Sequence, residues 1–235
     1  MVDFTSKKDT FKFPMRKYEK VLGIIHIPFH AIILPLLLIF ILSVFNADIS
    51  NPYRMLLYYA ISFVIVLAVM FRFLRSSFSD LIDGVWQAIQ ALILAYILYR
   101  ALLWVGALLL TQFMTEQNPN QDVLVTQVAA DFRVMIVVTV LLAPIVEETT
   151  FRGALFGTIR QKSRVAAYIV STVLFCFIHL WDFLVSDFSW ATFSALVQYV
   201  PASIALAWCY DRSGTIWMPI LMHMVINLTG VLQMR

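Results

Sequence analysis

Residues 21–45 read VLGIIHIPFHAIILPLLLIFILSVF and contain no Asp, Glu, Lys or Arg. A helix that crosses the hydrocarbon core of a bilayer needs about 20 mostly apolar residues, so this stretch is long enough to span a membrane. It is also longer than the apolar part of a secretory signal and has no small-residue cleavage site, which favours a retained span. The stretch therefore predicts a membrane protein.

The composition of the whole chain supports this prediction. Of its 235 residues, 61% are hydrophobic and only 13% are charged, whereas soluble domains have about 45–50% apolar and about 25% charged residues. Such a chain fits neither a soluble fold nor a disordered one. Its two cysteines, Cys176 and Cys209, lie in apolar runs, which excludes a secreted disulfide scaffold. The net charge of +3, without a basic stripe, predicts no nucleic-acid partner.

Apolar runs of spanning length recur along the chain, at Val21–Phe45, Met55–Leu74, Gly84–Leu110, Val134–Ile159, Val165–Val185, Trp190–Tyr210 and Ile216–Gln233. We therefore expect an all-α, polytopic transmembrane helix bundle with seven spans, or eight if Pro201 interrupts the sixth run. Lys and Arg concentrate in the connectors on the N-terminal side, which predicts a cytoplasmic N-terminus. We expect a multi-pass protein of the cell membrane, in a bacterial plasma membrane, with the lipid bilayer as its environment.

Ionisable side chains inside a span are costly and mark candidate functional sites. The densest group is Glu147, Glu148 and Arg152 in the fourth run. Glu148 and Arg152 are four residues apart and can form an ion pair, whereas Glu147 lies about 100° around the helix and needs a partner on another helix. The alternative is a helix end that meets water, but the apolar residues 154–156 that follow argue against it.

Two further groups lie in other runs. His179 is in the fifth run, and His223 and Asn227 are one turn apart in the seventh. A rise of about 1.5 Å per residue places all three groups at overlapping depths in the membrane. A single histidine in a span is more often a packing residue, but two at the depth of a carboxylate pair favour a functional cluster.

At these residues the sequence resembles the CAAX-protease and bacteriocin-processing (CPBP, or Abi) family of intramembrane proteases, which includes the Ras-converting CAAX endopeptidase. The family pattern is Glu-Glu-x-x-x-Arg, then Phe-x-x-x-His, then His-x-x-x-Asn/Asp. The matching residues here, within about 134–233, are Glu147 and Glu148 with Arg152, Phe175 with His179, and His223 with Asn227.

The resemblance implies an intramembrane endopeptidase that acts on a membrane-associated peptide or protein, either prenylated or hydrophobic. It implies that Glu147 and His179 activate a water molecule, and that His223 and Asn227 stabilise the oxyanion. Glu148, Arg152 and Phe175 are expected to support these groups. The predicted organisation is a basic cytoplasmic tail at 1–20, three spans with their connectors at 21–133, and a catalytic helix core at 134–235.

Other chemistries stay open at this point. Glu147, His179, His223 and Asn227 could instead hold a divalent metal such as Zn²⁺, as in a metalloprotease. Zinc ligands usually include a closely spaced His pair, and Asn is a weak ligand, so we favour hydrolysis without a cofactor. Cys176 lies near His179 in the sequence, but an apolar setting favours a structural cysteine over a nucleophile.

Two non-protease alternatives also remain. A non-catalytic membrane scaffold, or a self-immunity or regulatory protein, could keep the same fold. A proton-coupled transporter is disfavoured because the sequence shows no inverted repeat. His26 and His30 flank Pro28 in the first run. They could form a metal or proton site, but we expect a hydrogen-bonded pair at a proline-distorted turn.

Overall fold

The computed structural model describes residues 11, 13–114, 118–186 and 189–234, and within these ranges the chain forms helices and no strands. In chain order these are α1 (Lys17–Pro28), η1 (Phe29–Ile33), α2 (Leu34–Val44), α3 (Asn51–Asp83), α4 (Val85–Leu109), α5 (Thr111–Met114), α6 (Pro119–Ala130), α7 (Phe132–Ile136), η2 (Val137–Leu142), α8 (Ala143–Glu148), η3 (Thr149–Phe156), α9 (Gly157–Arg160), α10 (Arg164–Ser186), α11 (Trp190–Ser213) and α12 (Trp217–Gln233). The elements labelled η are π-helical turns. The predicted all-α polytopic bundle is confirmed.

The spans agree with the predicted apolar runs to within a few residues at each end, except that α3 continues nine residues past Leu74, to Asp83. Among the described residues, six helical segments are long and apolar enough to cross a membrane, and α12 is a shorter apolar helix. Pro201 lies inside α11 without interrupting it. The predicted connector after the third run contains α6, which begins where the Asn118 side chain accepts the N–H groups of Asn120 and Gln121. Residues 115–117 of this connector lie outside the described residues, as do 1–10 and 12 of the predicted tail.

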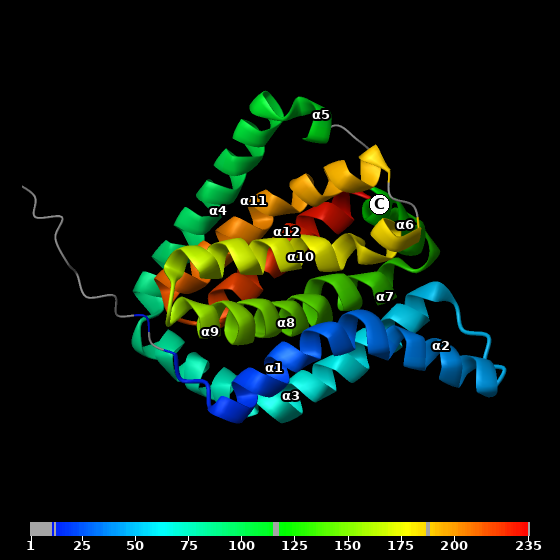
Figure 1. Cartoon of the computed structure of the whole chain (residues 1–235), viewed down its shortest axis with the longest axis horizontal. Helices are drawn as coiled ribbons and strands as arrows, with labels where there is room; N and C mark the ends of the chain where they lie inside the picture. Colours follow the sequence, from blue (N-terminus) through cyan, green and yellow to red (C-terminus); the bar gives the residue numbers. More distant parts are fainter. Residues whose placement is uncertain (1–10, 12, 115–117, 187–188, 235) are drawn as a thin grey trace, which may run out of the picture.

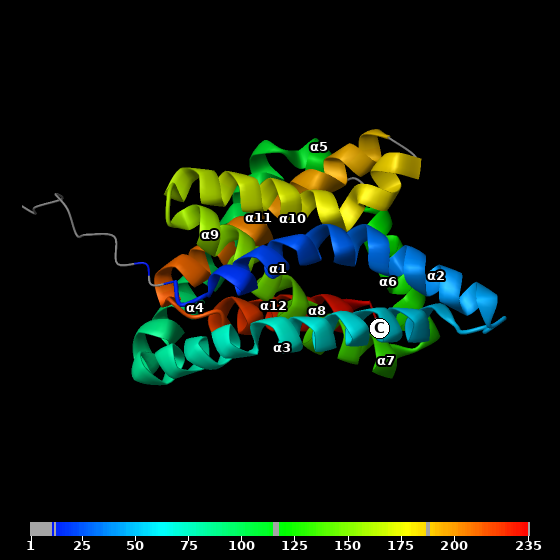
Figure 2. The ribbon, with the colours of Figure 1, turned by 60° about the horizontal axis from the view of Figure 1, so that its bottom comes forward.

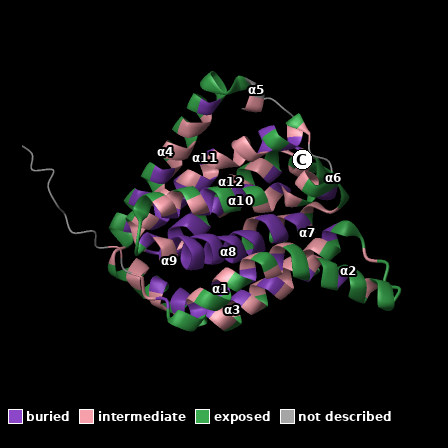
Figure 3. Cartoon of the chain, viewed as in Figure 1, coloured by how far each residue is buried: buried purple, intermediate pink, exposed green. Residues whose placement is uncertain are grey.

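The segment Phe132–Arg160, from α7 to α9, lies at the centre of the bundle. Two thirds of its most apolar part (67%) is buried by other helices, far more than in the first three spans, and Figure 3 shows α8 and the turn after it as buried. In Figure 1, α10 lies on one side of it and α1 and α3 on the other, while Figure 2 shows α12 beside α8. The predicted charged residues are therefore on the most enclosed helix.

Widened turns surround α8 on this central segment. Pro144 has no N–H to donate, and just before it the N–H of Ala143 reaches the carbonyl oxygen of Val138, five residues earlier. A second widened stretch, η3, follows α8 and carries Arg152. Such π-helical turns occur frequently at functional sites.

A buried carboxylate holds α1 against α3. The backbone of α3 departs from helical geometry at Met70 (φ −115°, ψ 15°), close to the point where the N–H of Phe73 donates to Glu19 Oε1 at 3.0 Å. Glu19 Oε2 accepts the N–H of Arg16 at 2.6 Å. Glu19 has no exposed surface, so this carboxylate of the predicted tail is an internal cap rather than a solvated charge.

Glu19→Ala is expected to lower the melting temperature of the protein in detergent micelles by several degrees. Two backbone N–H groups would lose their acceptor, and each buried group left unpaired costs about 1–3 kcal/mol. Scanning fluorimetry measures the change, with Asp48→Ala, which removes an exposed carboxylate between α2 and α3, as the control. Equal melting temperatures for the two variants would contradict the capping role.

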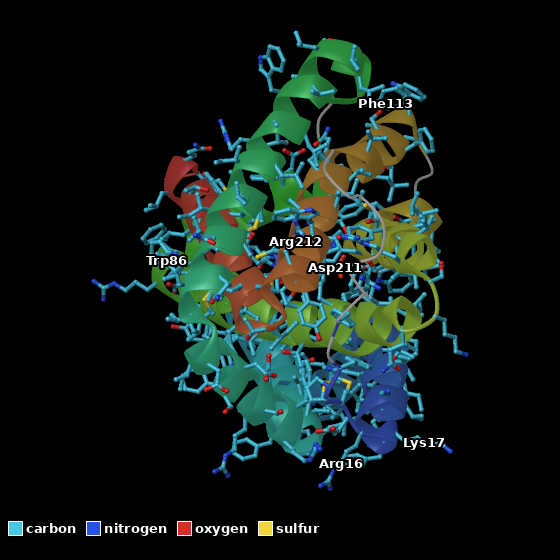
Figure 4. The ribbon with its side chains drawn as sticks, turned by 90° about the vertical axis from the view of Figure 1, so that its left-hand side faces the viewer. Arg16, Lys17, Trp86, Phe113, Asp211 and Arg212 are labelled. Carbon is cyan, nitrogen blue, oxygen red and sulfur yellow. The ribbon has the colours of Figure 1, made fainter. Side chains whose placement is uncertain are left out.

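Three basic connectors meet at one end of the bundle. Lys20 Nζ donates to Gln161 Oε1 at 3.1 Å, and Arg160 and Arg164 pair with the two carboxylate oxygens of Asp211 at 2.8 and 2.9 Å. Figure 4 looks onto this end, where Arg16, Lys17 and Arg212 are labelled. The connectors predicted to share a membrane side are thus in contact.

Candidate active site

Helices from separate parts of the chain bring the predicted residues together. Glu147 and Glu148 end α8, Arg152 follows in η3, Phe175 and His179 lie on α10, and His223 and Asn227 lie on α12. Glu148 and Arg152 have no exposed surface, and Glu147 and His223 are 7% and 6% exposed. The His179 side chain is 16% exposed.

One carboxylate oxygen of Glu147 faces both histidines. Oε2 lies 3.6 Å from His179 Nε2 and 4.0 Å from His223 Nε2. Within the described part of the chain this oxygen is buried and has no hydrogen-bond partner. The other oxygen, Oε1, accepts the hydroxyl of Tyr59 at 3.0 Å. The predicted partner of Glu147 on another helix is therefore present, as two imidazoles.

The other ring nitrogen of each histidine fixes its tautomer. His179 Nδ1 lies 2.7 Å from the carbonyl oxygen of Phe175, and His223 Nδ1 lies 2.8 Å from Glu148 Oε1. Both partners can only accept, so each Nδ1 carries a hydrogen and donates it. In a neutral imidazole, Nε2 is then an acceptor. Three acceptors thus converge on one buried point, and such a point needs a donor, for example water, or a cation.

The predicted ion pair of Glu148 and Arg152 is present. Arg152 Nη1 donates to Glu148 Oε1 at 3.1 Å, the same oxygen that receives His223 Nδ1. Arg152 Nη2 also donates to the carbonyl oxygen and the hydroxyl of Ser203, at 3.2 and 3.1 Å. Glu148 therefore links Arg152 to His223 and has the geometry of a supporting group.

Aromatic rings contact the imidazole of His179 from two helices. The ring centroid of Phe175 lies 4.4 Å from that of His179, and the centroid of Tyr199 lies 4.6 Å from it. Asn120 Nδ2 donates to the Tyr199 hydroxyl at 2.8 Å. Phe175 has the packing expected of it. Tyr199 and Tyr59 were missed, because neither belongs to a motif or carries a charge.

Asn227 has a different partner from the rest of the cluster. Its Nδ2 donates to the carbonyl oxygen of Thr139 in η2 at 2.8 Å. The amide nitrogen carries a second hydrogen, which this contact leaves available. The structure therefore joins three of the four predicted catalytic residues directly and places Asn227 one turn further along α12.

The metal alternative concerns the same side chains. Glu147, His179 and His223 are ligand types that Zn²⁺ accepts. Among the described side chains, however, no group of three or more His, Cys, Asp or Glu residues is arranged to hold a metal ion. The fourth predicted ligand, Asn227, is engaged with the backbone.

The remaining candidates are Cys176 and the histidine pair of the first span. Cys176 is a buried free thiol, as a structural cysteine would be. His26 Nε2 and His30 Nδ1 both contact the Ser62 hydroxyl, at 2.9 and 2.8 Å, beside the π turn that follows Pro28. The predicted hydrogen-bonded arrangement at a proline-distorted turn is confirmed.

This protein is an all-α, multi-pass membrane bundle with a buried Glu–His cluster between its helices. Residues 129–229 match the family model described as type II CAAX prenyl endopeptidase Rce1-like. The resemblance to CAAX endopeptidases, drawn from three motifs, is thereby confirmed for this part of the chain.

Two curated bacterial proteins are similar to the same extent. The chain is 31% identical over 94 residues to "Putative membrane peptidase YdiL" of Bacillus subtilis (strain 168), which covers 40% of this chain and 34% of that protein. It is 30% identical over 90 residues to "UPF0177 protein YxdF" of Lactococcus lactis subsp. lactis (strain IL1403), which covers 38% of this chain and 44% of that protein. The match thus spans less than half of either relative. No solved structure matches the chain.

Proposed function

We propose that this protein is an intramembrane endopeptidase that hydrolyses a peptide bond in a membrane-associated substrate, prenylated or hydrophobic. The family match supports a membrane protease at the level of the family. The observation that carries the proposal is the buried convergence of Glu147 Oε2 with the Nε2 atoms of His179 and His223. A water molecule can donate its two hydrogens to two of these three acceptors.

In the proposed reaction, the water donates to Glu147 Oε2 and to His179 Nε2. Glu147 takes one proton as general base while the water oxygen bonds to the carbonyl carbon of the substrate. The tetrahedral intermediate then collapses, its C–N bond breaks, and Glu147 returns the proton to the leaving amine. The products are a carboxylic acid and an amine, and transfer of the acid proton to the amine leaves a carboxylate and an ammonium group, so atoms and charge balance without a cofactor.

The oxyanion of this intermediate requires hydrogen-bond donors. Since His223 already uses the hydrogen on Nδ1 for Glu148, it has to carry a second proton to donate through Nε2. The Glu148 carboxylate is placed to pair with that imidazolium. Asn227 would donate the second hydrogen of its amide to the oxyanion, while the carbonyl oxygen of Thr139 accepts the first.

We also propose a topology and a division of the chain. The basic end of the bundle, with Arg16, Lys17 and Arg212 (Figure 4), would face the cytoplasm of a bacterial cell, in line with the positive-inside rule. Residues 134–235 would form the catalytic core, with the spans in 21–133 packed against it.

The proposal is tested with purified protein in detergent and three probes: a farnesylated CAAX peptide, the same peptide without its prenyl group, and a hydrophobic peptide. Mass spectrometry compares wild type with Glu147→Ala and His179→Ala, and with Asp48→Ala as the control. We expect cleavage only by wild type and the control. Cleavage that survives both site variants would contradict the mechanism, and cleavage by no form would favour the scaffold.

A chelator arm in the same assay tests the metal alternative. We expect cleavage to continue in the presence of phenanthroline, because the proposed reaction uses only side chains and water. Loss of cleavage that returns when Zn²⁺ is added back would instead establish a metalloprotease.

A further inference from the structure

Tyr59 reaches the candidate site from a part of the chain that the family match does not cover. It lies on α3, well before residues 129–229, and its hydroxyl donates to Glu147 Oε1 at 3.0 Å. Within the described residues it is the one hydrogen-bond donor to this carboxylate. The contact joins residues 88 positions apart in the sequence.

The contact fixes the orientation of the Glu147 carboxylate relative to the two histidines. The last torsion of a glutamate side chain is broad and roughly two-fold, so a carboxylate without a partner turns easily. With Oε1 held by the phenol, Oε2 is the oxygen directed at His179 Nε2 and His223 Nε2. A general base gains from such fixed geometry, because a misplaced group loses rate.

We propose that Tyr59 is a positioning residue that fixes the Glu147 carboxylate for proton transfer, so that the N-terminal spans complete the active site. This inference rests on the proposed function. Tyr59 does not touch the point where the three acceptors meet, and it acts through Glu147 alone.

The buried histidine pair of the first span packs beside Tyr59 and its neighbours on α3. His30 stacks on Tyr58, with ring centroids 4.6 Å apart and planes 25° apart, and both rings contact Tyr59 edge-on, at 5.5 and 4.9 Å. The Tyr58 hydroxyl donates to the carbonyl oxygen of His30 at 2.8 Å. Ser62, fully buried, joins His30 to His26. This polar and aromatic cluster holds α1 and η1 against the face of α3 that carries Tyr59.

Tyr59→Phe tests the inference because it keeps the ring and removes only the hydroxyl. We expect kcat for the farnesylated CAAX peptide to fall about 10- to 100-fold, the range for loss of one hydrogen bond to a charged group. KM should stay within about twofold, since Tyr59 does not contact the reacting atoms. Tyr53→Phe, an exposed tyrosine on the same helix, should leave both parameters unchanged. An unchanged kcat in Tyr59→Phe, with active wild type, would overturn the positioning role.

A spectroscopic arm works without any substrate. In protein labelled with ring-¹³C tyrosine, the infrared difference between wild type and Tyr59→Phe identifies the phenol band of Tyr59. We expect that band to shift in Glu147→Leu, which removes the acceptor, and to stay in place in Tyr53→Phe. A band that does not move in Glu147→Leu would overturn the contact. Failure of wild type to cleave would count against the proposed function, and the band would still decide whether Tyr59 holds Glu147.

Discussion

Glu147→Gln is expected to abolish peptide cleavage and, in the same preparation, to raise the melting temperature of the protein. The catalytic loss follows because an amide cannot take a proton from water at neutral pH. General-base catalysis contributes about 10²- to 10⁴-fold, so we expect kcat to fall by about that factor. The ring nitrogens of His179 and His223 would remain in place.

The gain in stability has a separate cause. In wild type, Glu147 is a buried carboxylate whose Oε2 faces two histidine nitrogens, and a buried charge remains costly even where a water bridges these atoms. A Gln side chain can turn its NH₂ group toward an imidazole and still accept the Tyr59 hydroxyl through its oxygen. Satisfying one buried polar group is worth about 1–3 kcal/mol, and each kcal/mol corresponds to about 2–4 °C in a domain of this size. Function would thus be maintained at the expense of stability.

Glu148→Gln is the matched control for this prediction. It makes the same chemical change at the adjacent residue. Because Glu148 pairs with Arg152 and His223, the loss of its charge weakens both contacts, and the melting temperature of this variant should fall. Scanning fluorimetry in detergent and kcat for the farnesylated CAAX peptide are measured on each variant. A lower melting temperature in Glu147→Gln than in wild type would contradict the stability argument.

Arg152→Met is expected to cause the largest loss of stability among single changes at the site. Arg152 and Glu148 are both fully buried, and removal of one partner leaves the other charge uncompensated, which costs about 3–5 kcal/mol. The guanidinium also lies 4.1 Å from the centre of the Phe175 ring and binds Ser203, so packing is lost as well. We expect the melting temperature to drop by about 10 °C.

Two comparisons separate charge from packing in this experiment. Arg164→Met removes an arginine that also pairs with a buried carboxylate, but Arg164 is 52% exposed and Asp211 keeps Arg160, so little change is expected. The double variant Arg152→Met with Glu148→Gln removes the unpaired charge and should recover part of the loss. A double variant less stable than Arg152→Met alone would show that the buried charge was not the cause.

The sequence determined the spans and the local charge pair. In a bilayer every backbone polar group must be satisfied within the helix, so the lengths of the apolar runs predict the spanning helices directly, whereas α6 lies in a predicted connector. The Glu148–Arg152 pair was equally readable, because residues four apart meet on one helix whatever the rest of the fold does. The motif order also identified Glu147, His179 and His223 as candidates.

Only the tertiary structure decided what surrounds those residues. Tyr59 and Tyr199 come from α3 and α11, and in a chain this rich in aromatic residues nothing marks them as neighbours of Glu147 and His179. Glu19 belongs to a polar segment by its sequence, but it is buried and accepts the N–H of Phe73 in α3. Periodicity within a helix reports which residues share a face, whereas the partner of that face depends on how apolar helices pack, and many packings bury similar area. The candidate residues could therefore be read from motifs, and their geometry required the fold.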